Sequence, residues 1–300
     1  MLTTRLWMGA LLVTLLALGL WIDERFVADF PPWVPPFPCW LVVSIVVMVG
    51  CCRELRQLMR RREIRPSRVV SYGSVIGVVL ANWIPWLHGS NAASDHLAWA
   101  FAAMCLANMI VFVREAIIFR EPGLAVMTAG GGMLLVFYLG GLASFLIELR
   151  WLANGLLALA ALLAAAKCGD IGAYFGGRAF GRHKLWPALS PGKTIEGALF
   201  GLAASVVGTL SVIAVGAKLT GSPWALSAWA AVLFGVTVGG MAQMGDLIES
   251  MIKRDCQQKD ASDLVPGFGG VLDVLDSPLF SAPLAFLFWI WLGPGWGSGL

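Results

Sequence analysis

The chain has 300 residues, of which 58% are hydrophobic and 13% charged, with a mean hydropathy of +0.79 and a net charge of +3. This composition excludes an ordinary soluble domain, because apolar runs long enough to cross a bilayer recur along the sequence. The small positive charge does not indicate nucleic-acid binding, since no basic face alternates with exposed aromatic residues.

The apolar runs predict an all-α, polytopic membrane protein of about nine transmembrane helices, because each crossing needs about 20 residues. The first run has a single basic residue before it and no small-x-small cleavage pattern, so we expect a retained span and not a signal peptide. The second run is short and flanked by prolines, so it could be shifted or partly re-entrant. In chain order, the spans are expected near residues 6–22, 38–52, 69–88, 97–113, 124–147, 151–168, 195–217, 224–244 and 278–293.

The basic residues predict the orientation of these spans. If the Arg-rich loop 53–68 is cytoplasmic, nine spans place every Lys and Arg on the cytoplasmic side except Arg25, Arg150 and Lys218. The positive-inside rule expects such a skew, and a wrong number of spans would have scrambled it. The net positive charge is therefore interpreted as a sign of topology and of contact with anionic lipid.

Residues 1–166 form a predicted N-terminal transmembrane region with little polar content apart from its basic loop. The glycine-rich segments 129–133 and 139–144 indicate close helix packing, because small residues let backbones approach in lipid; a glycine-lined substrate path is the alternative. The six cysteines show no CxxC or Cys/His metal spacing and are expected to be reduced structural thiols, with lipidation of Cys51 and Cys52 as the alternative.

Residues 167–300 form a predicted catalytic transmembrane region that differs in kind from the first. Half of the acidic residues of the chain fall here, in two cytoplasmic loops, 168–197 and 245–277, and in the helix ends beside them. Any chemistry is therefore expected at the cytoplasmic face of this region.

The second of these loops gathers carboxylates. If the preceding span continues as a helix through residues 245–256, Asp246 and Glu249 share one face with Ser250 and Lys253. Asp273 and Asp276, three residues apart, follow a glycine-rich turn at 266–270 and again share a face. Clustered carboxylates repel one another near a membrane, so they need a cation, which can be a nearby Lys or Arg or a divalent ion such as Mg²⁺.

Positive charge lies beside these carboxylates, at Lys253, Arg254 and Lys259. Carboxylates for a metal together with Lys and Arg for phosphates are what metal-assisted phosphoryl or nucleotidyl transfer requires. The alternative is an ordinary charged interfacial loop whose residues neutralise one another.

The first loop offers a second phosphate site in the sequence SPGKTIEG, residues 190–197. Lys193 stands just before a predicted helix start at Thr194, which is expected to cap that helix, and amides at a helix N-terminus attract phosphate oxygens. Glu196 either stabilises the helix dipole or binds a metal or sugar. The segment is not a Walker A loop, because the first glycine of that motif is missing. Upstream, Arg178 shares a helix face with Asp170 and Tyr174.

The ordered residues from Ser250 to Asp276 resemble the signature of the phosphatidate cytidylyltransferase (CDP-diacylglycerol synthase) family. The preceding GDLIES, the SPGKTIEG segment and the AYFGGR and FGRHKL runs match as well, so the resemblance covers about residues 168–283. Two positions depart from it, because Phe268 replaces the usual His and Val274 the usual Arg. The matching positions of the signature are Ser250, Ile252, Lys253, Arg254, Lys259, Asp260, Pro266, Gly269, Gly270, Asp273 and Asp276.

The resemblance implies transfer of the CMP moiety of CTP to phosphatidic acid, giving CDP-diacylglycerol and pyrophosphate in phospholipid biosynthesis. It implies a bacterial inner-membrane enzyme with its active site facing the cytoplasm, in contact with membrane lipid, and a homodimer is expected. Asp246, Asp273 and Asp276 would hold Mg²⁺ and, with Lys253, carry the catalysis. The implied substrate contacts are Ser190, Lys193, Thr194, Glu196, Ser250, Arg254, Lys259, Asp260 and Arg178.

Other classes make different predictions. A CTP-dependent polyprenol kinase would phosphorylate an alcohol and release CDP. A CDP-alcohol phosphotransferase would need a D-G-x-x-A-R run, which the sequence lacks. A transporter would place charge in broken helices at the bilayer midplane, whereas the charges here gather at one face.

Overall fold

The computed structural model describes residues 2–26, 31, 34–89, 93–152, 154–220, 226–262 and 269–293. Almost all regular structure in these residues is helical, which confirms the all-α prediction. Seven described helices are long and apolar enough to span a membrane, so the polytopic membrane class is confirmed while the expected count of nine is not. These candidate spans are Pro38–Arg60, Asp95–Ile118, Ala125–Glu148, Gly155–Phe180, Ile195–Leu219, Ala228–Asp255 and Leu272–Leu292.

The span expected at 69–88 is replaced by two shorter helices. Helix α3, Arg68–Ala81, has 14 residues, and a four-residue helix α4, Ile84–Leu87, follows it. The chain breaks at Asn82, whose side-chain amide donates to the carbonyls of Val78 and Val79. Asn side chains compete in this way with the backbone ladder, and Pro85 cannot continue it. Neither helix reaches the roughly 20 residues of a full crossing.

The chain divides into two compact units, each described here by itself: residues Met1–Ile147 with Cys256–Val274, and residues Glu148–Asp255 with Leu275–Leu300. Regular structure in the first unit comprises α1 Leu2–Phe26, α2 Pro38–Arg60, α3, α4, α5 Ala93–Ile118, α6 Ala125–Leu135, the π-helix η1 Val136–Gly141 and α7 Leu142–Glu148, whose last residue falls in the second unit. The second unit contains α8 Gly155–Phe180, β1 Lys184–Trp186, β2 Ser190–Thr194, α9 Ile195–Thr220, α10 Ala228–Asp255 and most of α11 Leu272–Leu292.

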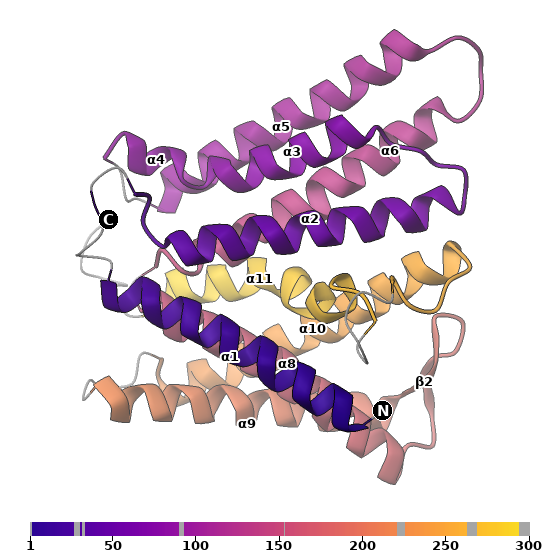
Figure 1. Cartoon of the computed structure of the whole chain (residues 1–300). Coiled ribbons are helices and arrows are strands. Elements are labelled where there is room, and N and C mark those ends of the chain that lie inside the picture. Colours follow the sequence, from indigo (N-terminus) through magenta and orange to yellow (C-terminus); the bar gives the residue numbers. More distant parts are fainter. Residues whose placement is uncertain are drawn as a thin grey trace. The chain divides into compact units, whose positions relative to one another are not determined.

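In the first unit, α2, α3, α5 and α6 run alongside one another (Figure 1). Their packing depends on the glycines that the sequence indicated. A Cβ on Gly132 would come within 2.8 Å of Val111, and one on Gly140 within 3.0 Å of Val78. Val78 and Val111 belong to the buried core of this unit. The packing role predicted for the glycine-rich segments is therefore confirmed. Cys51 and Cys52 are fully buried, which favours a structural role over lipidation.

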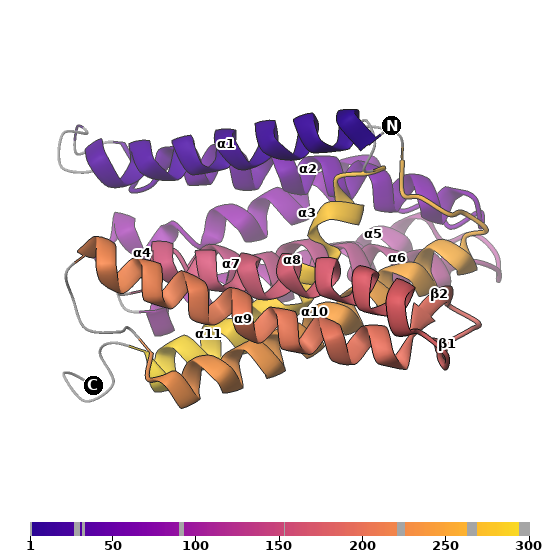
Figure 2. The same ribbon diagram turned by 90° about the horizontal axis from the view of Figure 1, so that it is seen from below.

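In the second unit, α8 and α9 lie side by side, with the β1–β2 hairpin at one end of the pair (Figure 2). A Cβ on Gly172 of α8 would overlap Ala204 of α9. Ser205 of α9 is fully buried and donates a 2.7 Å hydrogen bond to the carbonyl of Ala165 on α8. On the other side of the unit, Phe234 of α10 packs edge-on against Phe288 and Trp289 of α11.

We expect Gly172→Ala to destabilise the protein by about 1–3 kcal/mol, because the added methyl group must displace backbone or Cβ atoms of α9. Gly77→Ala is the matched control, since a Cβ at this α3 glycine meets nothing within 4 Å. The measurement is the thermal unfolding midpoint of the purified protein in detergent. Equal midpoints for the two variants would contradict the tight α8–α9 contact.

Candidate active site

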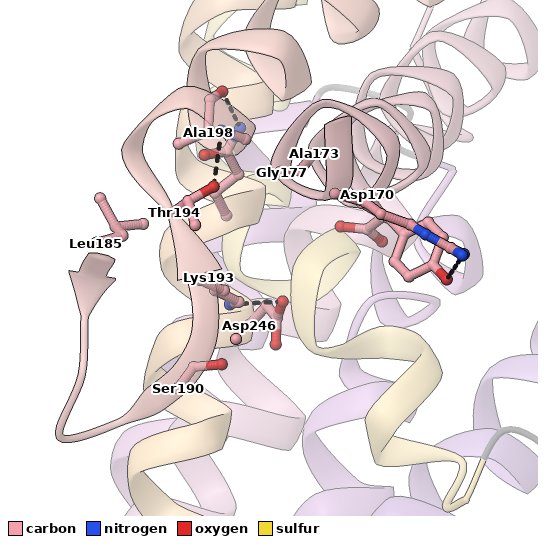
Figure 3. A pocket seen from close by; sticks show the side chains of 14 residues that line it. Asp170, Ala173, Gly177, Leu185, Ser190, Lys193, Thr194, Ala198 and Asp246 are labelled. Carbon is pink, nitrogen blue, oxygen red and sulfur yellow. Dashed lines mark hydrogen bonds and ion pairs between the residues drawn. The ribbon is translucent and has the colours of Figure 1, made fainter. Parts of the chain in front are cut away.

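A cavity of about 490 Å³ opens in the second unit between α8, the hairpin, the start of α9 and α10 (Figure 3). Segments far apart in the sequence contribute to its wall, since α8 and α10 are separated by the hairpin and the whole of α9. Its polar lining consists of Asp170, Tyr174, Arg178, Ser190, Lys193, Thr194, Gln243 and Asp246.

An ion pair joins the two motif segments at the wall of this cavity. The Nζ atom of Lys193, on β2, lies 2.6 Å from Oδ2 of Asp246, on α10 (Figure 3). Both side chains are only partly exposed, at 27% and 35%. The extension of the α10 span as a helix through Asp255, predicted from the sequence, carries Asp246 to this position. Gln243, one turn earlier on α10, donates to the carbonyl of Ala198 and ties α10 to α9.

The hairpin that presents Lys193 is anchored to the first turn of α9. Thr194 caps this helix as predicted, because its Oγ1 accepts a 3.1 Å hydrogen bond from the amide of Gly197. Glu196 accepts hydrogen bonds from the amides of Arg182 and His183, at 3.0 and 3.1 Å, and contacts the His183 ring at 2.6 Å. The structure therefore gives Glu196 a role that sequence reasoning did not consider, which is to close the hairpin.

A carboxylate cluster lies next to the ion pair. One carboxylate oxygen from each of Asp246, Glu249 and Asp276 can be chosen so that all lie within 4.8 Å of one another. Close approach of α11 to α10 makes this possible, since a Cβ on Gly245 would lie 2.7 Å from the carbonyl oxygen of Asp276. Glu249 is 1% exposed and forms an ion pair with Lys253 one turn along α10.

Sequence reasoning placed Glu249 on the face of Asp246 but did not include it among the site residues. The signal was its i, i+3 spacing, which puts two carboxylates on one helical face. The sequence alone did not show that Asp276 of α11 lies next to this face of α10. Glu249 therefore joins Asp246 and Asp276 as a candidate site residue.

The cluster has the chemistry that a magnesium ion requires. All three side chains offer oxygen atoms, and Glu249 and Asp276 are buried, at 1% and 4% exposure. Mg²⁺ binds through one or two carboxylates plus waters and substrate phosphates, so three carboxylates beside an open cavity are sufficient. Asp246, Glu249 and Asp276 thus fit a hard divalent cation.

The remaining predicted residues divide between the two units. Ser250 is half-buried and Arg254 exposed, both on α10 in the second unit, and Arg178 is exposed at the cavity with its Nη1 3.4 Å from the hydroxyl of Tyr174. Lys259 and Asp260 are exposed and belong to the first unit.

Asp273 also belongs to the first unit. Its Oδ2 accepts hydrogen bonds from the amides of Ala261 and Gly270, at 3.0 and 2.6 Å. Val274 is half-buried in the first turn of α11, whereas Phe268 lies outside the described residues. Asp273, Lys259 and Asp260 are not among the residues that line the cavity.

We expect Glu196→Ala to make the hairpin several-fold more sensitive to trypsin after Arg182 and Lys184, because the variant removes the acceptor of two backbone amides. The rate of cleavage under native conditions, followed by mass spectrometry of the fragments, measures this. Glu121→Ala, at an exposed position of the first unit, serves as the control. Unchanged cleavage of the Glu196 variant would show that this carboxylate does not hold the hairpin.

Known proteins resemble this chain over most of its length. A model of the cytidylyltransferase family matches residues 3–292. A phosphatidate cytidylyltransferase of Synechocystis is 30% identical over 280 residues, which cover 84% of this chain and 88% of that protein. One of Bacillus subtilis is 30% identical over 253 residues, 82% and 88% of the two chains. An uncharacterised Escherichia coli protein, YnbB, is 31% identical over 229 residues, 72% and 73% of the two. The chain therefore belongs to the cytidylyltransferase family and is a nucleotidyltransferase.

Proposed function

We propose that this protein transfers the CMP moiety of CTP to phosphatidate, forming CDP-diacylglycerol and pyrophosphate. The relatives that cover most of the chain support this choice, because their names specify phosphatidate as the acceptor. The observation that carries the proposal is the Lys193–Asp246 pair at the wall of one cavity, in which Asp246 also belongs to the carboxylate cluster.

The reaction needs charge neutralisation more than it needs a strong base. The attacking oxygen of phosphatidate is already anionic; it forms a bond to the α-phosphorus of CTP while the bond to pyrophosphate breaks. The protein has to bring two polyanions together and stabilise the charge that grows on the leaving group. Lys193 lines the cavity and is our first candidate for a contact with the triphosphate, and Arg178 is the second.

The roles of the other predicted substrate contacts are proposed from the hydrogen bonds that they can form and from their position relative to the cavity. Ser190 is half-buried at the cavity and can donate a hydrogen bond to a phosphate oxygen, while Thr194 caps the helix start below it. Lys253 neutralises Glu249 and is proposed to hold this carboxylate in place. Ser250, Arg254, Lys259 and Asp260 stay predictions from the family signature. Glu196 is proposed to act by holding the hairpin and not as a ligand.

We propose that Asp246, Glu249 and Asp276 hold Mg²⁺, which when bound would neutralise charge on the triphosphate and its leaving group. Asp273, expected from the signature to share this role, accepts two backbone amides in the structure. Its part as a metal ligand stays a prediction.

The membrane setting follows from the substrate. The acyl chains of phosphatidate remain in the leaflet, and its headgroup has to meet CTP at the membrane surface. We propose that this surface is the cytoplasmic face of a bacterial inner membrane, because basic residues of the second unit gather at the cavity end of α8 and in the hairpin. The expected homodimer stays a prediction.

One assay tests the reaction. Purified protein is incubated with labelled CTP, phosphatidate and Mg²⁺, and the nucleotide products are separated. Formation of CDP-diacylglycerol with stoichiometric pyrophosphate supports the proposal. Release of CDP with a polyprenol acceptor would favour the kinase alternative, and no lipid product despite CTP binding would reject the proposed transfer.

We expect Asp246→Asn to lower the rate of CDP-diacylglycerol formation by about 100-fold or more, because it removes a charge from the carboxylate cluster and breaks the pair with Lys193. The control is Glu121→Gln, an equivalent loss of charge at an exposed residue. Initial rates are compared at saturating CTP and Mg²⁺, on samples with matched unfolding midpoints. Full activity of Asp246→Asn would remove this residue from the proposed site.

A further inference from the structure

Glu54 is a buried carboxylate that the proposed reaction does not use. It lies in the candidate span of α2, within the Arg-rich segment that was read from sequence as a sign of orientation. Its relative exposure is 0%. Burying a carboxylate costs several kcal/mol unless hydrogen bonds compensate it, so a chain retains one in a membrane helix where it performs a task.

The contacts of Glu54 reach across more than 200 positions of the sequence to one short segment. Its Oε1 accepts hydrogen bonds from the hydroxyl of Ser262, at 2.6 Å, and from the amide of Val271, at 2.9 Å. Its Oε2 accepts a 2.8 Å hydrogen bond from the amide of Leu272. These two amides stand at the start of α11, where a helix leaves its amides without partners. Glu54 therefore caps α11 from another helix, and its negative charge suits the helix dipole there.

The same backbone is held by a second carboxylate. Asp273 accepts hydrogen bonds from the amides of Ala261 and Gly270, so Glu54 and Asp273 together bind four amides in residues 261–272. Both glycines of this turn are needed for the approach. A Cβ on Gly270 would lie 2.6 Å from Oε2 of Glu54, and Gly269 has a φ of +97°, which L side chains rarely adopt.

We propose that Glu54 is a positioning residue for the family signature. It fixes the backbone at residues 269–272 and thereby the orientation of Asp273. The inference rests on the proposed function for its catalytic consequence, but the contact itself does not. All its residues belong to the first unit. The basic segment 53–68 thus holds the start of α11 within the first unit through its one buried acidic residue, in addition to its predicted effect on topology.

The structural part is tested by hydrogen exchange of peptides that cover residues 269–275. Glu54→Gln keeps the size of the side chain but replaces one acceptor oxygen with a donor, so we expect exchange at Val271 and Leu272 to accelerate about tenfold or more. Glu63→Gln, at an exposed position just beyond α2, is the matched control. Unchanged exchange in Glu54→Gln overturns the proposal. Because exchange needs no substrate, it remains decisive if the wild-type chain makes no CDP-diacylglycerol, a result that would reject the proposed function instead.

The catalytic part rests on the prediction from the signature that Asp273 is a metal ligand, and it is tested by steady-state kinetics on folded samples. We expect Glu54→Gln to lower kcat about 10- to 100-fold with little change in the KM for CTP, as for residues that orient a site without touching substrate. Gly270→Ala places a methyl group against the carboxylate of Glu54, so it should lower kcat by a similar factor. The double variant should lose no more of kcat than the more affected single variant. A residue with a merely structural role would lower the unfolding midpoint and leave kcat per folded molecule unchanged. That result, or additive losses, would overturn the positioning role.

Discussion

The need to satisfy carboxylates inside an apolar helical protein governs how both units are built. In the first unit, Asp23 of α1 is fully buried and accepts the amides of Cys39 and Trp40 at the start of α2. Glu54 of α2 does the same for α11. Each of these acidic side chains supplies the acceptor that a helix start lacks, and each helix start supplies the donors that a buried carboxylate needs. Helix α2, which has no side-chain cap of its own, is thereby fixed to α1, and the start of α11 is fixed to α2.

Glycine makes these polar contacts geometrically possible. Gly270 leaves room for the carboxylate of Glu54, and Gly245 lets the backbone of Asp276 approach α10 closely enough to complete the carboxylate cluster. The same device packs α8 against α9 at Gly172, where the neighbouring atoms are the Cβ of Ala204 and the backbone of α9. Small residues in this chain therefore serve two purposes, which are van der Waals packing in lipid and access of carboxylates to backbone donors.

The sequence was sufficient for features that depend on local pattern. Continuous hydropathy identified the long helices, and the Ser-Pro-Gly-Lys-Thr order predicted the cap at Thr194. It was insufficient where a distant partner decides the outcome. The helix break at Asn82 reflects competition between a side chain and the backbone, which hydropathy averages away. The role of Glu54 could not be predicted from its place in the Arg-rich segment, because its partners are more than 200 residues distant and their spacing leaves no periodic signal.

The charges at the cavity wall and next to it place a requirement on substrate binding. Three carboxylates, Asp246, Glu249 and Asp276, face two ammonium groups, Lys193 and Lys253, each already paired with a member of the cluster. A triphosphate brought to this wall adds several negative charges next to carboxylates, and repulsion at such separations is severe where water is scarce. Two lysines that are already paired, together with Arg178 at the cavity, do not balance three carboxylates and a triphosphate. CTP is therefore expected to enter together with a cation, and the proposed contact of Lys193 with phosphate requires that Lys193 release Asp246. The Lys193–Asp246 ion pair is, on this argument, the arrangement that substrate and cation jointly replace.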